Sequence, residues 1–195
     1  MKNLLNAIEL KSKLKAMNEQ GFTQIKLPGG TSRDRQHYSG LIIPYYNFED
    51  KMTYFSGLPY NPNFHKNGTE NVDNKKEGET PLQTAIREGM EEIGLIFKPE
   101  DLEEVLSAMV KIKDRVNPEL ILHIKHFFVA KSFSGEAFEF EGPNPIDHET
   151  AAPIWIPAPI FKEILWKGHQ PAFNASFSEI LCTDGDIYNS MYKLF

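Results

Sequence analysis

The chain has 195 residues, of which 41% are hydrophobic and 25% are charged. This composition is typical of soluble globular proteins, and the length suits one domain, residues 1–195, with a substantial core. A net charge of −6 and a pI near 5.5 exclude the basic footprint of proteins that bind long nucleic acids. Since no apolar run approaches the length of a membrane span, we also expect no membrane partner.

The N-terminal residues predict a helical extension on a cytoplasmic protein. Apolar residues recur at helical intervals among lysines over residues 2–18, which predicts an amphipathic helix ending at Gly21. Residues 1–20 lack the continuous apolar core of a secretion signal. Cys182 is the only cysteine, which excludes an internal disulfide and fits a reducing compartment. The extension can pack on the domain or on a second subunit, so a homodimer is compatible with the sequence.

Residues 38–77 predict a hairpin followed by a long loop. The segments 38–46 and 52–60 are rich in aromatic and β-branched residues and are separated by a polar turn. We therefore expect two paired strands. Residues 61–77 are rich in Asn and Gly, which is typical of a long connection.

The segment 77–97 predicts a loop and a capped helix. Thr80 can cap the helix, Pro81 suits the first helical position, and Gln83 completes a capping box. Gly94 can adopt the left-handed conformation that closes a helix, so the helix should run from Pro81 to near Ile93. Apolar and small residues at three- and four-residue steps predict one buried stripe, consisting of Leu82, Ala85, Ile86, Gly89, Met90 and Ile93.

The other side of this helix carries a cluster of three carboxylates, Glu88, Glu91 and Glu92. Two such charges ~6 Å apart repel by roughly 3 kcal/mol at an effective dielectric constant of ~20. A divalent cation would turn this repulsion into binding, and oxygen-only ligands favour Mg²⁺, or Mn²⁺. The alternative is that the glutamates form a solvated helix surface.

The spacing of these residues resembles the Nudix box, and the matching segment is residues 73–95. Seven of its nine specified positions are occupied as the pattern requires, by Glu79, Arg87, Glu88, Glu91, Glu92, Gly94 and Leu95. Asp73 stands where the first glycine belongs, and Gly89 stands where an aliphatic residue is usual. The first departure matters more, because the family's glycine permits a tight loop close to the metal site.

A Leu-Pro-Gly-Gly run at residues 27–30 is similar to the Pro-Gly-Gly that often precedes a Nudix box. It lies about 50 residues before Glu79, far beyond the usual separation. We therefore interpret it as a turn that takes no part in the site.

The resemblance implies an α/β fold, a Nudix-type α/β/α sandwich with a mixed central sheet and an added N-terminal helix. It implies a metal-dependent pyrophosphohydrolase that cleaves a nucleoside diphosphate linked to another moiety into a nucleoside monophosphate and a phosphorylated product. The partner would be a small-molecule nucleotide diphosphate derivative. Glu88, Glu91 and Glu92 would hold Mg²⁺, while Arg87 and Glu79 would orient them.

The remaining elements should complete the sheet and cover it. Strands are predicted at residues 106–113, 120–131 and 153–156, a helix from Pro157 or Pro159 to near Gly168, and a second helix over residues 174–181. His123 and His126 lie on opposite faces of their strand and are interpreted as structural. Many members of the family supply a further carboxylate from the connection before the last strand, and here Glu141 is the first candidate and Glu149 the second.

Several alternatives stay open. The general base can be Glu88, Glu141 or Glu149. The protein can also be a catalytically weak or inactive Nudix-fold module that binds a nucleotide or a protein, an alternative supported by Asp73 and the long loop. The intact carboxylate cluster favours the hydrolase. The sequence does not indicate which diphosphate is the substrate.

Overall fold

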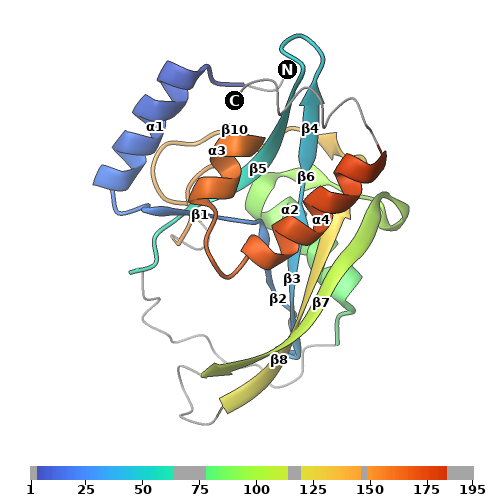
Figure 1. Cartoon of the computed structure of the whole chain (residues 1–195). Helices are drawn as coiled ribbons and strands as arrows, with labels where there is room; N and C mark the ends of the chain where they lie inside the picture. Colours follow the sequence, from blue (N-terminus) through green and yellow to red (C-terminus); the bar gives the residue numbers. More distant parts are fainter. Residues whose placement is uncertain (1–3, 64–77, 114–119, 146–148, 184–195) are drawn as a thin grey trace.

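The computed structural model describes residues 4–63, 78–113, 120–145 and 149–183. Asp73 and most of the predicted loop 61–77 lie outside the described residues, so their effect on the site stays a prediction. The described part is a mixed α/β structure with a mixed sheet between helices, as the predicted fold class requires (Figure 1).

The mixed sheet has the strand order β2-β3-β8-β7. The bounds of these strands are Gly29–Thr31 for β2, His37–Ile42 for β3, Leu120–Ala130 for β8 and Leu102–Lys113 for β7. β3 and β8 run parallel, with Tyr38 beside Lys125, whereas the other neighbours are antiparallel. β7 and β8 confirm the two strands predicted at residues 106–113 and 120–131, and β7 begins earlier than predicted.

The second sheet is antiparallel and is organised around β5 (Met52–Tyr60). β5 pairs with β1 (Gln24–Lys26), β4 (Pro44–Asn47) and β10 (Ile154–Pro157). The predicted hairpin is therefore only partly right, because β4 pairs with β5 but β3 belongs to the mixed sheet. The chain passes from one sheet to the other at Ile43. A short pair, β6 (Leu95–Ile96) and β9 (Ser134–Gly135), lies apart from both sheets.

The described helices are α1 (Ala7–Glu19), α2 (Pro81–Ile93), α3 (Ala158–Ile164) and α4 (Gln170–Thr183), with a 3-10 turn, η1 (Pro99–Asp101). α1 begins later than predicted because Asn6 caps it: the Asn6 side chain accepts the backbone N–H groups of Ile8 and Glu9. α3 and α4 confirm the two predicted late helices, with α4 starting earlier. No described helix combines the length and the apolar character needed to cross a membrane.

α2 begins and ends where predicted. The Thr80 hydroxyl accepts the N–H of Gln83 across 3.2 Å, and the Gln83 side chain accepts the N–H of Thr80 across 2.9 Å. Gly94 closes the helix in the left-handed conformation, with φ of 76°. Of the predicted stripe, Ala85, Gly89 and Ile93 are buried, whereas Met90 is 48% exposed.

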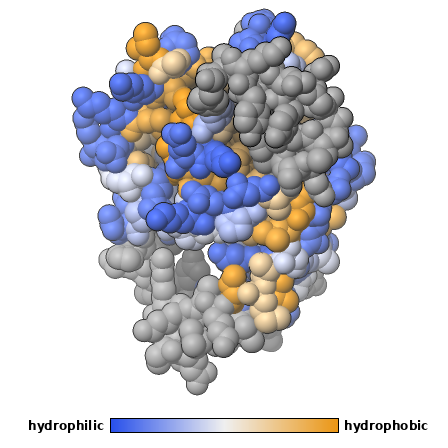
Figure 2. Space-filling model, viewed as in Figure 1, coloured by the Kyte–Doolittle hydropathy of each residue, from blue (hydrophilic) through white to orange (hydrophobic). Residues whose placement is uncertain are grey.

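Alternation along the strands of the mixed sheet places helices on both of its faces. Leu41 packs under α2 with Ala85, and the next residue, Ile42, packs on the opposite side with Phe173 of α4. α2 and α4 therefore cover opposite faces, as predicted. Leu10 of α1 packs in the same hydrophobic cluster as Ile42 and Phe173, and the outer side of α1 carries hydrophilic side chains (Figure 2).

Candidate active site

Arg87 holds three of the predicted site carboxylates together. Its Nε and Nη2 groups donate to the two oxygens of Glu79 across 2.7 Å and 3.0 Å. Its Nη1 group donates to Glu88 across 2.6 Å and to Glu91 across 2.8 Å. Paired contacts of this kind fix the position of a carboxylate more firmly than a single hydrogen bond does. The predicted orienting pair, Arg87 and Glu79, therefore lies where it can act on the cluster.

Glu79 is an ionised anchor. The hydrogen bonds from Arg87 lower the pKa of Glu79 to about 2, although burial acts in the opposite direction. The backbone N–H of Arg33 adds a further hydrogen bond of 2.9 Å. Burial disfavours the Arg87 cation, but its carboxylate partners outweigh this effect and raise the pKa of Arg87. Glu79 therefore positions Arg87 and exchanges no proton near neutral pH.

Thr84 and His37 form a chain of polar contacts that ends at Glu79. The Thr84 hydroxyl donates to Glu79 across 3.3 Å and lies 3.2 Å from Nε2 of His37. Burial lowers the pKa of His37, so the imidazole is neutral at physiological pH. His126, predicted to be structural, lies beside His37 and contacts Glu104 across 2.7 Å.

Glu88 has a raised pKa. Burial, followed by repulsion from Glu92, raises the pKa of Glu88 to about 7, although Arg87 opposes this shift. Gly30 of β2 lies directly against the Glu88 carboxylate, where a Cβ atom would overlap it. The missing side chain at position 30 therefore lets β2 approach the helix. A carboxyl group with this pKa can exchange a proton or bind a cation near neutral pH.

Glu92 lies on the buried side of the cluster and is only 7% exposed. Its Oε2 accepts the backbone N–H of Gly29 across 2.5 Å, and its Oε1 accepts from Nζ of Lys26 across 3.1 Å. Burial disfavours the Lys26 cation, but Glu92 and its neighbours raise the pKa of Lys26 above its ordinary value. The buried carboxylate is tolerated because both of its oxygens have partners.

The Leu-Pro-Gly-Gly run belongs to the site, which corrects its interpretation as an uninvolved turn. Gly29 binds Glu92 and Gly30 adjoins Glu88. Separation along the chain gave the wrong answer because the chain leaves the site after Thr31, forms β3, β4 and β5, and returns at Gly78. Gly30 is thus a glycine close to the carboxylates, whereas Asp73 lies outside the described residues.

Gly89 is explained by its neighbours. A Cβ atom there would lie 2.6 Å from Cε2 of Phe97 and 2.9 Å from Cδ1 of Leu41. The Phe97 ring therefore fills the space that an aliphatic residue at position 89 would occupy. The departure from the box pattern leaves the three carboxylates of α2 in place.

An aromatic and cationic wall adjoins Glu92, and the sequence analysis did not predict it. The wall consists of Lys26, Tyr38, Tyr60, Lys125 and Trp166. The two lysines lie over the rings: Nζ of Lys26 is 5.8 Å from the centre of Tyr60, and Nζ of Lys125 is 5.3 Å from Tyr38 and 5.4 Å from Trp166. The residues come from β1, β3, β5, β8 and the connection between α3 and α4. No spacing in the sequence joins them, so only the fold reveals the wall.

Glu149 lies close to this wall. The next residue, Thr150, pairs with Tyr60 of the wall in an antiparallel bridge. The backbone oxygen of Glu149 accepts the N–H of Asn61, next to the end of β5. Glu149, the second candidate for the further carboxylate, therefore lies near the wall that adjoins Glu92.

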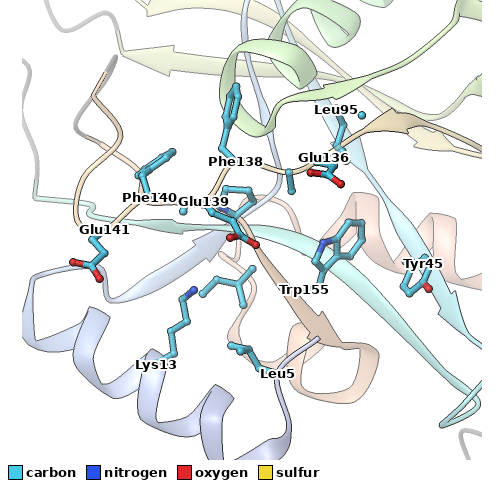
Figure 3. Close-up of a pocket in the computed structure, with 15 residues that line it drawn as sticks. Leu5, Lys13, Tyr45, Leu95, Glu136, Phe138, Glu139, Phe140, Glu141 and Trp155 are labelled. Carbon is cyan, nitrogen blue, oxygen red and sulfur yellow. The ribbon is translucent and has the colours of Figure 1, made fainter. Parts of the chain in front are cut away.

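Glu141, the first candidate, lies elsewhere. It lines a cavity of about 950 Å³ between α1, β10 and residues 135–141, together with Lys13 and Trp155 (Figure 3). None of the three α2 carboxylates lines this cavity. The structure therefore does not bring Glu141 together with the rest of the predicted site.

The chemistry of the α2 carboxylates fits a divalent cation. They supply oxygen atoms only, and repulsion from Glu92 adds to the effect of burial in raising the pKa of Glu88. Within the part of the chain that the structure describes, no three His, Cys, Asp or Glu side chains converge closely enough to hold a metal ion as they stand. Arg87 and Lys26 take up the carboxylate oxygens instead.

Comparison with known proteins gave structural similarities only. No family model and no curated protein sequence matches the chain. Among solved structures, the NUDIX domain of NrtR from Shewanella oneidensis, solved with ADP ribose, is similar at 12% identity and a TM-score of 0.47, over 73% of this chain and 86% of that one. The E. coli ORF135 protein is similar at 15% identity and a TM-score of 0.44, over 79% and 89%.

A Nudix hydrolase from M. smegmatis, RenU, is similar at 14% identity and a TM-score of 0.42, over 80% of this chain and 96% of that one. TM-scores below 0.5 are too low to decide function or family. We therefore base the functional interpretation on the residues of the site.

Proposed function

We propose that the protein is a metal-dependent pyrophosphohydrolase that cleaves a nucleoside diphosphate linked to another moiety. The observation that carries this proposal is the convergence of Glu79, Glu88 and Glu91 on the guanidinium of Arg87, with Glu92 held beside them by Gly29 and Lys26. The products would be a nucleoside monophosphate and a phosphorylated remainder.

Mg²⁺ or Mn²⁺ held by Glu88, Glu91 and Glu92 would neutralise the diphosphate and lower the pKa of a bound water. The chain's own residues have separate tasks. Glu79 fixes Arg87, and Arg87 orients Glu88 and Glu91 through its Nη1 group. Lys26 and Gly29 fix Glu92 from the opposite side. These contacts hold each carboxylate in one orientation, and the binding of a cation would require their oxygens to converge further.

The reaction consumes one water. Its oxygen forms a bond to one phosphorus, the bond from that phosphorus to the bridging oxygen breaks, and the bridging oxygen leaves with the other phosphate. A carboxylate accepts the proton of the water. Glu149 is our choice for this role because its charge acts on Lys26 and Tyr38, next to Glu92, and Glu88 is the alternative because its pKa is about 7.

A binding module without catalysis is the second candidate function. It is favoured by one observation: Arg87 and Lys26 already neutralise the carboxylates that a metal would need. In such a protein, the cluster would be a structural ion-pair network.

Phosphate-product release from a panel of nucleoside diphosphate derivatives, with Mg²⁺ or Mn²⁺, distinguishes the two candidates. The native protein should turn over at least one derivative, and a Glu91→Gln, Glu92→Gln double variant should not. Glu100→Gln is the matched control, because Glu100 is an exposed glutamate of η1. Nucleotide binding without turnover by the native protein would contradict the hydrolase and favour the binding module.

A further inference from the structure

Lys125 occupies an unusual position for a lysine. Its ammonium group lies between two aromatic rings, 5.3 Å from the centre of Tyr38 and 5.4 Å from the centre of Trp166. The side chain is half-buried, and burial lowers the pKa of Lys125 below its ordinary value. Contacts with ring faces recover only part of the hydration that the ammonium loses.

No carboxylate of the described residues forms an ion pair with Lys125, and no described group hydrogen-bonds to its ammonium. Lys26, the other lysine of the wall, differs, because it is ion-paired to Glu92 across 3.1 Å. The wall therefore contains one cation that positions a site carboxylate and one that has three N–H donors to offer. A partly buried cation in this state is a good partner for an anion.

Lys125 lies next to the candidate active site. Tyr38 is its neighbour across the parallel pair of β3 and β8, and the charges of Glu92 and Glu88 contribute to the raised pKa of the Tyr38 phenol. His169 lies between the two lysines: its Nδ1 accepts the N–H of Leu27, next to Lys26, across 3.1 Å, and its Nε2 lies 3.4 Å from the hydroxyl of Tyr38, which Lys125 contacts. A substrate phosphate beside Glu88 and Glu92 therefore has a neighbouring position at the Lys125 ammonium.

We propose that Lys125, flanked by Tyr38 and Trp166, is a substrate-binding residue that holds a second anionic group of the substrate, beyond the phosphate at the α2 carboxylates. This inference rests on the proposed function and narrows its substrate class. The substrate is a diphosphate derivative whose two phosphates, or whose remainder, present negative charge to both positions. Derivatives whose second part is neutral bind more weakly.

The test is calorimetric binding of inorganic pyrophosphate, ADP and adenosine to the full chain in EDTA, where turnover is prevented. The native protein should bind pyrophosphate and ADP, and ADP more tightly than adenosine. Lys125→Gln should weaken both anions about tenfold or more, as expected for a lost charge-assisted hydrogen bond, without affecting adenosine. Lys125→Arg should retain most of the affinity.

Lys131→Gln is the matched control, since Lys131 directly follows β8 and its side chain is 62% exposed. Thermal unfolding of each variant checks that it is folded. Native-like affinity of folded Lys125→Gln for pyrophosphate and ADP would overturn the inference, as would the absence of anion binding by the native protein.

The outcome is separable from that of the proposed function. Glu91→Gln, Glu92→Gln should lose turnover and keep binding that depends on Lys125. Binding that depends on Lys125 without any turnover by the native protein contradicts only the hydrolase. Turnover with binding that does not depend on Lys125 contradicts only the inference drawn here.

Discussion

The backbone N–H of Gly29 donates to Oε2 of Glu92 across 2.5 Å, between residues that are 63 positions apart in the chain. The same carboxylate accepts from Lys26 on its other oxygen. Gly29 begins β2, the edge strand of the mixed sheet, which thus lies against α2 and fixes one of the three carboxylates that we propose as metal ligands.

The Lys26–Glu92 pair gives the first prediction. Lys26→Met removes the cationic partner of the buried Glu92 carboxylate, so the free energy of unfolding should fall by about 2–4 kcal/mol. Adding Glu92→Gln should restore most of this loss, because the stranded charge is removed. Urea denaturation of the two variants measures both effects. Equal stability of Lys26→Met and the native protein would show that the pair is unimportant.

Glu88 gives a prediction about pH. Its pKa is about 7 in the folded chain and 4.5 as the ordinary value, so the folded state binds more protons between these two values. Without metal, this group's contribution therefore makes the protein less stable as pH rises from about 4.5 to 7. Glu88→Gln should remove that loss and stabilise the metal-free protein by about 1–3 kcal/mol at pH 8.

Denaturant unfolding in EDTA at pH 5 and pH 8 measures the effect, as the difference between native protein and Glu88→Gln. The gain should be larger at pH 8 than at pH 5. The same substitution should weaken Mg²⁺ binding, because one ligand oxygen pair is lost. A gain that is equal at both pH values would mean that Glu88 titrates normally.

Gly89 and Phe97 give a prediction about packing. Gly89→Leu places the aliphatic residue of the box pattern where the Phe97 ring lies, so the free energy of unfolding should fall by about 1–3 kcal/mol. Phe97→Ala alone should also destabilise, by leaving a cavity. The double variant should be more stable than the sum of the single effects predicts. If the two effects are additive in thermal or urea unfolding, the Phe97 ring does not fill the space of an aliphatic side chain at position 89.

Glu149 and Glu141 give a prediction about catalysis. Glu149→Gln should lower kcat by about 100-fold or more if Glu149 accepts the proton of the attacking water. Glu141→Gln should change kcat little, because Glu141 lines the cavity beside α1. Steady-state kinetics on the best substrate of the panel compares them. A large loss for Glu141→Gln with none for Glu149→Gln would reverse the assignment.

The local parts of this protein could be predicted from its sequence. The helix α2 begins after Thr80 and ends at Gly94 as predicted, because caps and a left-handed glycine act within a few residues of each other. Arg87 and Glu91 are four residues apart, on adjoining turns of one helix, so their contact also follows from the sequence. The contact of Arg87 with its neighbour Glu88 does not follow from this spacing.

The non-local parts were decided by the tertiary structure. Sequence separation misplaced Gly29 and Gly30, whose contacts with Glu92 and Glu88 depend on strands that form between them and α2. The predicted hairpin also paired the segment around Tyr38 with β5, whereas this segment forms β3 and lies beside β8. Strand patterns show which residues can form a sheet but do not specify the partner strand.

What the sequence determined by itself is the carboxylate-bearing helix α2, since its carboxylates, caps and buried stripe are set by steps of three and four residues. What only the tertiary structure decided is the surroundings of that helix: the glycines against Glu88 and Glu92, the ion pair with Lys26, and the wall that contains Lys125 and Trp166. These residues come from separate strands and loops, and only the packing of the two sheets brings them together.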